Sequence, residues 1–390
     1  MKGKLKYIIT VSCFILFIFG FAIAGLICKD REFSDMENRT LQQFPQFSFK
    51  ALKEGNFTSD IDEYMSDQIF LKDPLVTLKT DTDRLLLKTY QNGVYFGKDG
   101  YYLQDYQENK EQIDTNVSCL NDFADKIKGE ADISFMLVPN AISVMEDKLP
   151  AVTQTDDQTK SIEYVKNQLS KNISFYCPYD DLKKAYESGT QVFYRTDHHW
   201  TSDGAKIGFE GLMNAMGETI PQVNYSEEIL PDFYGTLYSK APSSIAESDQ
   251  VKLYTNPDNK LKVTYTGTSG DNTALSSAEN ITSDSLFDNQ FKQKKDKYKT
   301  FMGGNFDMLT IESNGESDEN VLIVKDSYAN CTLPYFADKY KHITVMDMRY
   351  YHMQEELTVS EYIKEHKISK VIFLYNMDFL NSDINFTWLD

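Results

Sequence analysis

The sequence predicts an α/β protein built on a parallel β-sheet with helices on both faces. Four short runs are almost wholly apolar, at residues 133–138, 321–324, 343–346 and 371–374. Such runs are typical of parallel strands, which are buried on both faces. Stretches with a helical spacing of apolar residues lie between them, as in folds that alternate strand and helix. The 390 residues are 41% hydrophobic and 25% charged, which is typical of a globular protein with a large core.

Charge and cysteine content exclude several classes of protein. Lys and Arg total 40 and Asp and Glu total 59, which gives a net charge of −19. A surface of this sign repels a phosphate backbone, so we expect no nucleic-acid partner. The five cysteines lack metal-ligand spacing, and Cys13 and Cys28 lie in the apolar N-terminal stretch. We therefore expect neither a disulfide framework nor a zinc site.

The N-terminus predicts the compartment. Three lysines precede an uncharged run from Tyr7 to Ile27, which is long enough to span ~30 Å of hydrocarbon as a helix. Positive charge before the run and the charged residues 29–32 after it indicate a cytoplasmic N-terminus and an exported body. We expect residues 1–29 to form a cytoplasmic tip and a single-pass anchor in the cell membrane. A cleaved signal peptide is the alternative, because residues 22–24 have cleavage-site spacing.

Residues 30–90 are expected to form a membrane-proximal helical arm. Apolar side chains between Phe57 and Phe70 follow an approximate 3,4 spacing, which indicates an amphipathic helix. Pro74 interrupts the pattern, and several leucines follow it. We interpret this arm as a packing element.

Residues 91–390 are expected to form the main domain. Turn signals at residues 92–93 and 98–100 flank two short apolar runs and predict a β-hairpin. The zone from about residue 216 to residue 314 is polar, and we interpret it as an insertion that overhangs a site.

Two features stand out inside this insertion. Residues 256–259 read Asn-Pro-Asp-Asn and predict a hairpin between the runs 253–255 and 263–266. Five lysines lie between Lys292 and Lys299. A solvated helix accounts for them, and a patch for an anionic ligand is the alternative.

The first segment with a chemical pattern is Asp197-His198-His199-Trp200, which follows the β-like run 192–194. In an extended chain residues i and i+2 point the same way, so Asp197 and His199 are expected to share one face. An Asp beside a His fixes the tautomer of the ring and stabilises the imidazolium formed in proton transfer. Metal binding and structural hydrogen bonding are the alternatives. Adjacent His side chains diverge in an extended chain and no second His or Cys cluster exists, so we expect no metal.

The second segment is Lys325-Asp326-Ser327-Tyr328, which follows the apolar run 321–324. Ser327 is thereby predicted at the carboxyl end of a strand and at the start of a helix, the edge where open α/β sheets bind ligands. The helix start also offers N–H groups suited to an oxyanion. A serine hydroxyl needs a base to act as a nucleophile, and His199 is the natural one. The alternative is that Ser327 caps the helix.

These segments resemble the bacterial DHHW proteins, which are named for the tetrad. That family is similar to the SGNH-hydrolase-like domain of the alginate O-acetylation proteins. The resemblance covers roughly residues 55–380 and is poor over the insertion. The matching motifs, in chain order, are Gly97-Lys98-Asp99-Gly100-Tyr101, Leu137-Val138-Pro139-Asn140, the tetrad itself and the block around Ser327.

The resemblance implies a three-layer SGNH-hydrolase-like sheet and a triad of Ser327 as nucleophile, His199 as base and Asp197 as its orienter. It implies an extracytoplasmic serine O-acetyltransferase that acts on a cell-surface or secreted polysaccharide through an acyl-serine. The implied partners are a glycan substrate and a membrane-bound O-acyltransferase that donates the acetyl group; no metal or other cofactor is expected. The alternatives are a carbohydrate acetylesterase with the same triad and an inactive glycan-binding scaffold of an envelope assembly.

Some residues depart from the family pattern or extend it. Lys325 replaces the glycine that precedes Asp-Ser in the relatives. Asn140 and Tyr328 are further expected contacts for an oxyanion or for substrate, although Asn140 lacks the lysine context of some relatives. Arg195 is expected to orient Asp197 or a substrate carboxylate, with a surface ion pair as the alternative.

The expected topology can be tested with a reporter fused after Asp390. The lysines before the apolar run place the C-terminus outside the cytoplasm, so a reporter that works only there should be active. Activity from a reporter restricted to the cytoplasm would refute this orientation.

Overall fold

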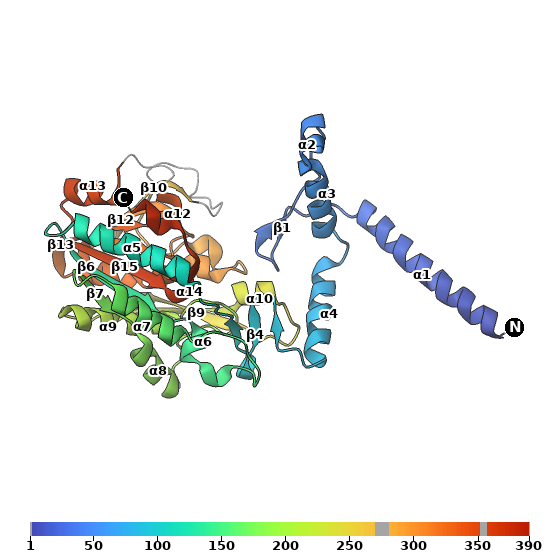
Figure 1. Ribbon diagram of the computed structural model, residues 1–390, viewed down its shortest axis with the longest axis horizontal. Helices are drawn as coiled ribbons and strands as arrows, with labels where there is room; N and C mark the ends of the chain where they lie inside the picture. The colour runs from blue at the N-terminus through green and yellow to red at the C-terminus, as the bar shows by residue number, and fades with distance from the viewer. Residues whose placement is uncertain (1, 270–280, 352–356, 390) are drawn as a thin grey trace. The chain divides into compact units, whose positions relative to one another are not determined.

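The computed structural model describes residues 2–269, 281–351 and 357–389. The chain divides into two compact units. One unit comprises Met1–Gln91 with Ser239–Ala246, and the other comprises Asn92–Tyr238 with Glu247–Asp390. Figure 1 shows their elements coloured along the chain.

The first unit is mainly helical. Among the described residues one helix, α1, is long and apolar enough to cross a membrane, over Lys4–Gly25, and by length and composition it fits a single-pass anchor. Helices are also present in the segment predicted to form an arm. The elements are α1 (Lys2–Ile27), β1 (Phe33–Ser34), β2 (Arg39–Thr40), α2 (Phe49–Glu54), α3 (Asn56–Asp67), α4 (Lys72–Leu85) and β3 (Tyr90–Gln91).

The break between α3 and α4 differs in position from the expected one. Pro74 lies in the first turn of α4 and does not interrupt a helix, because the first-turn N–H groups have no intrahelical partner to lose. The chain turns instead just before α4, where Leu71 adopts a left-handed φ of 57°.

A buried carboxylate at the end of α3 links the segment around β2 to the start of α4. Asp67 at the end of α3 is 1% exposed and forms a bidentate ion pair with Arg39. It also accepts hydrogen bonds from Lys72 Nζ at 3.0 Å and from the backbone N–H of Gln42 at 2.9 Å. The hydrogen bond from Arg39 outweighs the effect of burial and holds the pKa of Asp67 well below its usual range.

The second unit contains the sheet. Its elements, with 3₁₀ helices marked η, are β4 (Val94–Phe96), η1 (Lys98–Gly100), β5 (Tyr102–Gln104), α5 (Lys110–Lys126), β6 (Asp132–Val138), α6 (Ala141–Val144), η2 (Glu146–Lys148), α7 (Gln158–Gln168), β7 (Ile173–Tyr176), α8 (Tyr179–Glu187), α9 (Ser202–Met216), β8 (Ser226–Phe233), α10 (Thr236–Lys240), β9 (Asp249–Thr255), β10 (Lys262–Ser269), β11 (Ile281–Ser283), η3 (Asn289–Phe291), η4 (Lys297–Thr300), β12 (Phe306–Glu312), β13 (Ser317–Lys325), η5 (Ser327–Cys331), α11 (Leu333–Lys339), β14 (Tyr340–Met346), α12 (Met348–Tyr351), α13 (Val359–Glu365), β15 (Lys370–Asn376), α14 (Met377–Ser382) and η6 (Asn385–Trp388).

The central sheet has eight strands in the order β11-β10-β12-β14-β13-β15-β6-β7. The strands from β14 to β7 in this order are parallel to one another. They include all four predicted apolar runs, and their inward side chains form the core. Helix α5 lies over β15, with the rings of Phe123 and Phe373 5.6 Å apart (Figure 1). The predicted hairpin before the sheet is also present, as β4 paired antiparallel with β5.

The sheet is mixed, which corrects the prediction that it is wholly parallel. Strands β10, β11 and β12 come from the predicted insertion and join the edge next to β14 in antiparallel pairing. Their sequences alternate, with Val263 and Tyr265 buried between more polar residues. Antiparallel strands tolerate one solvent-exposed face. The composition of this zone is therefore polar, although much of the zone forms β-sheet.

The hairpin predicted across residues 256–259 is wrong. Strand β9 pairs with β8, and β10 joins the central sheet. The amides of Asn256 and Asn259 each donate to Asp338 Oδ1 at 2.7 Å, which anchors the turn to α11. The lysine cluster forms no α-helix; its described residues include the short helix η4, and Lys297 is buried.

The ion pairs of Asp67 predict a local loss of protection on substitution. Asp67→Asn in the full-length protein should speed hydrogen exchange of the Gln42 amide about tenfold at neutral pH, because a buried pair contributing roughly 1–2 kcal/mol is lost. Since its folded pKa is lowered, ionised Asp67 stabilises the unit above about pH 4 and this stabilisation fades as the pH falls further. Asp62→Asn on the exposed face of α3 is the control; equal exchange in both variants would contradict the prediction.

Candidate active site

The carboxyl ends of the parallel strands meet at one edge of the sheet. Ser327 follows β13 there, and Asp326 before it caps η5 by accepting the N–H of Tyr328 at 2.7 Å. The other Asp326 oxygen accepts the backbone and side-chain N–H groups of Asn376, at the end of β15, at 2.7 and 2.6 Å. Burial raises the pKa of Asp326, and these donors oppose that effect. The backbone that carries Ser327 is thus fixed from two strands.

The Asp-His-His-Trp tetrad lies on a tight loop and not on an extended strand. Phe193 and Trp200 form an isolated antiparallel bridge, and the residues between them turn back. The buried carboxylate of Asp249 holds the start of this loop, accepting the N–H groups of Arg195 and Thr196 at 2.9 Å each. Helix α9 begins immediately after the loop.

Ser327, His199 and Asp197 form a continuous hydrogen-bonded chain. The Ser327 hydroxyl lies 2.8 Å from His199 Nε2, and His199 Nδ1 lies 2.6 Å from Asp197 Oδ1. A carboxylate only accepts, so Nδ1 carries the hydrogen and Nε2 of the neutral ring accepts from Ser327. The contact expected between Ser327 and His199 is therefore present, and the geometry suits a serine activated by a base.

The surroundings of Asp197 keep it ionised. It is 1% exposed and its Oδ2 accepts from Thr236 N at 2.8 Å and Thr236 Oγ1 at 3.1 Å. Burial opposes ionisation, but His199, His198 and these donors outweigh it and hold the pKa of Asp197 well below its usual range. Gly235 leaves room for the carboxylate, because a Cβ there would lie 2.2 Å from Asp197 Cβ.

A tyrosine from the predicted insertion fixes the plane of the His199 ring. Tyr298 is buried and stacks on His199 with centroids 3.8 Å apart and an interplanar angle of 11°. Its hydroxyl donates to the carbonyl oxygen of Ser327 at 2.8 Å. Tyr298 therefore contacts both the base and the backbone of the serine.

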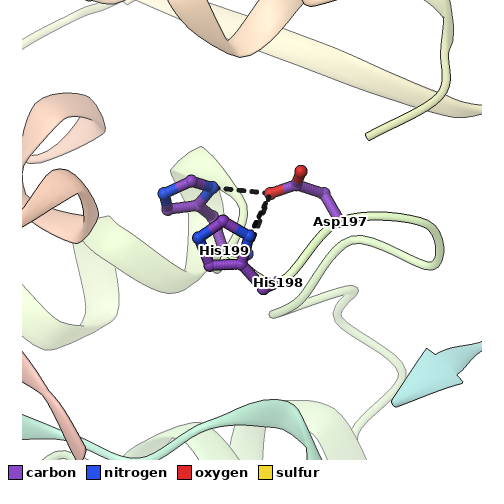
Figure 2. A group of neighbouring side chains, drawn as sticks. All are labelled: Asp197, His198 and His199. Atoms are coloured by element: carbon purple, nitrogen blue, oxygen red, sulfur yellow. Dashed lines mark hydrogen bonds and ion pairs between the residues drawn. The ribbon is translucent and has the colours of Figure 1, made fainter. Parts of the chain in front are cut away.

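The position of His198 corrects the expectation that it points away. Its ring centroid lies 3.8 Å from that of His199, with the rings tilted by 37°. Figure 2 shows both rings directed toward one oxygen of Asp197, and His198 Nδ1 is 3.8 Å from it. The alternation of an extended chain does not hold, because the loop is tightly turned.

Asp197, His198 and His199 offer ligand atoms within 4.8 Å of one another, a spacing that a metal ion could use. In this arrangement the Nδ1–H group of His199 donates to Asp197, and His198 Nδ1 lies 2.6 Å from Thr236 Oγ1. Both nitrogens nearest the carboxylate thus already make hydrogen bonds, and the arrangement suits proton transfer.

Asn140 and Tyr328, expected as contacts for an oxyanion or for substrate, are hydrogen-bonded to each other. The two amide hydrogens of Asn140 are donated to the Tyr328 hydroxyl and to Asn376 Oδ1, both at 2.9 Å. The Tyr328 hydroxyl donates to the carbonyl oxygen of His198. These side chains therefore brace the loop and the strand ends. Arg195 lies 3.9 Å from Asp249 and 4.0 Å from Glu247, so its ion pairs are with these residues.

Ser327 does not cap the helix that follows it, since Asp326 has that role. The helix is a short 3₁₀ segment, and the N–H groups of Tyr328 and Ala329 bond to Asp326. The side chain of Lys325 is 1% exposed and contacts Asn330 at 2.8 Å and Asp347 at 3.3 Å.

Sequence reasoning missed Thr236, Gly235 and Tyr298. All three lie in the zone that it treated as an insertion, and no motif marks them. Gly235 lies between a strand and a short helix that begins at Thr236, and this turn pattern is the one signal that could have drawn attention to the pair.

Comparisons with known proteins agree with this architecture. The family model described as DHHW protein matches residues 88–346, more than half of the chain. A DHHW family protein from Eubacterium siraeum has a TM-score of 0.64 and 24% identity, over 76% of this chain and 94% of that one. Bacillus cereus PatB1 with a sulfonyl adduct has a TM-score of 0.62 and 22% identity, over 75% and 97%. These likenesses show the shared fold.

A curated relative is more distant. The protein named probable alginate O-acetylase AlgJ, from Pseudomonas fluorescens, is 22% identical over 193 residues. The match covers 47% of this chain and 49% of that protein, so the chain spans about half the length of the curated relative that it matches.

The hydrogen-bonded chain predicts the tautomer of His199. Nitrogen NMR of protein labelled in its five histidines should show His199 protonated at Nδ1 when neutral. In Asp197→Asn the amide donates to Nδ1 instead, so the proton should move to Nε2. The signal of His342, an exposed histidine on β14, serves as control. An Nε2-protonated ring in the unmodified protein would contradict the geometry.

Proposed function

The chain belongs to the DHHW protein family, and from this we propose that it is a serine O-acetyltransferase acting on a cell-surface or secreted polysaccharide. The observation that carries the proposal is the chain of hydrogen bonds from Ser327 through His199 to Asp197. Ser327 is partly exposed at the carboxyl edge of the sheet, where substrates reach open α/β sheets.

The proposed reaction has two steps. In the first, His199 Nε2 takes the proton of Ser327 as Oγ attacks the carbonyl carbon of an acetyl donor. The donor's leaving group then receives that proton, and acetyl-Ser327 is formed. In the second, a sugar hydroxyl attacks the acetyl carbon and gives its proton to His199, which returns a proton to Ser327 Oγ as the ester bond breaks. Asp197 stays ionised and stabilises the imidazolium in both steps.

Two relatives support this proposal. The name of AlgJ describes acetylation of alginate, a polysaccharide. PatB1 is described with a sulfonyl adduct, and activated nucleophiles attack the sulfur of sulfonyl reagents, so such a reagent is a suitable probe for Ser327.

The proposal includes placement and partners. We propose a three-layer SGNH-hydrolase-like arrangement, with the triad outside the cytoplasm and α1 as the membrane anchor. The substrate is then an exported glycan, and a membrane-bound O-acyltransferase supplies the acetyl group. No nucleic acid takes part, as the net charge of −19 argues.

A carbohydrate acetylesterase is the second candidate function. The same triad serves it, because only the acceptor differs: water in place of a sugar hydroxyl. The inactive scaffold is the third reading, and it requires that Ser327 fail to react.

The proposal predicts labelling and acylation of Ser327. The full chain in detergent should react with a sulfonyl fluoride at Ser327 and release nitrophenol from p-nitrophenyl acetate. Ser327→Ala should abolish both, and Asp197→Asn and His199→Ala should lower turnover by about 10³–10⁴-fold, as loss of a triad member does elsewhere.

Ser317→Ala, at the opposite end of β13, is the matched control and should keep its labelling. His198→Ala should lose far less turnover than His199→Ala. Absence of labelling in the unmodified protein would favour the scaffold, and acetate as the sole product with glycan present would favour the esterase.

A further inference from the structure

The second imidazole of the tetrad has no part in the triad, yet it lies beside it. We propose that His198 binds the acceptor sugar at acetyl-Ser327 and thereby favours transfer to a glycan over loss of the acetyl group to water. This inference rests on the proposed function and adds to it the residue that selects the acceptor.

The two rings face the same way. Figure 2 shows that His198 and His199 both turn one nitrogen to Asp197 and the other nitrogen to the opposite side. On that side Nε2 of His199 reaches Ser327 at 2.8 Å. The ring centroids are 3.8 Å apart, and Nε2 of His198 lies on the same side of the rings as Nε2 of His199.

The hydrogen bonds of the loop set the tautomer of His198. The Thr236 hydroxyl donates to Asp197 at 3.1 Å, so at 2.6 Å from His198 Nδ1 it accepts the hydrogen of that nitrogen. Nε2 of the neutral ring is then an acceptor. The carbonyl of His198 accepts from Tyr328, which fixes the backbone. His198 is thus a preorganised acceptor and not a mobile surface residue.

His198 is also the imidazole that a ligand can reach. Its side chain is 27% exposed, compared with 6% for His199. His199 is held between the rings of Tyr298 and His198, so only its edge at Ser327 takes part in the reaction. A glycan that approaches acetyl-Ser327 therefore contacts His198.

This geometry distinguishes a sugar from water. The attacking hydroxyl gives its proton to His199 Nε2, its oxygen bonds to the acetyl carbon, and the Ser327 ester bond breaks with the proton returned to Oγ. A neighbouring hydroxyl of the same sugar can at that moment donate to His198 Nε2, since the rings of His198 and His199 are adjacent and turn Nε2 to the same side. A single water molecule makes only the first contact. Vicinal diols are the ligand chemistry that the pair of imidazoles fits.

The test measures how acetyl-Ser327 divides between acceptors. The full chain in detergent is acylated with p-nitrophenyl acetate in the presence of methyl glucoside, which has vicinal hydroxyls, or of n-propanol, which has one. Mass spectrometry gives the ratio of acetylated alcohol to acetate. The ratio does not depend on the rate of acylation, so it isolates the choice of acceptor.

In the unmodified protein the ratio should be higher for methyl glucoside than for n-propanol. His198→Leu, which has no acceptor, should lower the ratio for methyl glucoside roughly 3–10-fold, the effect of one hydrogen bond, and leave that for n-propanol nearly unchanged. His198→Gln retains an acceptor and should restore part of the preference. His342→Ala, at a distant exposed histidine, is the matched control.

An equal ratio for both alcohols, or the same preference in His198→Leu, would overturn the inference while the burst of nitrophenol still supports acylation of Ser327. Absence of the burst in the unmodified protein would overturn the proposed function and this inference with it. If His198→Leu fails to fold, His198→Gln decides. A preference for methyl glucoside over n-propanol in His198→Gln that equals the preference of the unmodified protein would contradict the proposal.

Discussion

The site depends on the fact that parallel strands end at the same edge of the sheet. The strands β6, β13 and β14 are each followed within two residues by an Asn or Asp, and β15 ends in Asn376. Their side chains join the strand ends, since Asp326 accepts from Asn376, Asn376 accepts from Asn140, and Asn140 donates to Tyr328. An unpaired buried polar group costs ~1–3 kcal/mol, so each member of this network holds the others in place. This network therefore fixes the position of Ser327, which follows Asp326 directly.

The loop that carries Asp197 and His199 is held by a balance between burial and charge. Burial disfavours the carboxylate of Asp197, and the imidazoles and the donors of Thr236 favour it more strongly. Those donors, the space beside Gly235 and the ring of Tyr298 all come from residues 235–298, far from the loop in sequence. The segment that sequence analysis treated as an overhanging insertion is therefore part of the architecture of the site, and strands from it complete the central sheet.

The sequence predicted the parts of the molecule in which residues act locally. Apolar runs marked the parallel strands, and Ser327 followed one of them as expected. The run 263–266 was expected in a hairpin with 253–255; it lies in β10, but β10 pairs with β12 in the central sheet, because local turn signals do not determine which strands pair. The pairing of Asp197 with His199 was expected from an extended chain, but it occurs on a tight loop. On this loop the rings of His198 and His199 lie side by side, whereas an extended chain would direct them to opposite faces. Thr236 and Tyr298 could not be found, since only the tertiary fold brings them to His199.

The departure at Lys325 has a structural explanation. Its ammonium group is buried beside Asp347 and Asn330. Burial lowers the pKa of Lys325, and the charge of Asp347 opposes this effect. A buried cation with a carboxylate and amide oxygens around it is satisfied, so removing it would leave Asp347 with Arg349 alone. The Lys325 side chain therefore joins the end of β13 to Asn330 in η5 and to Asp347, which follows β14.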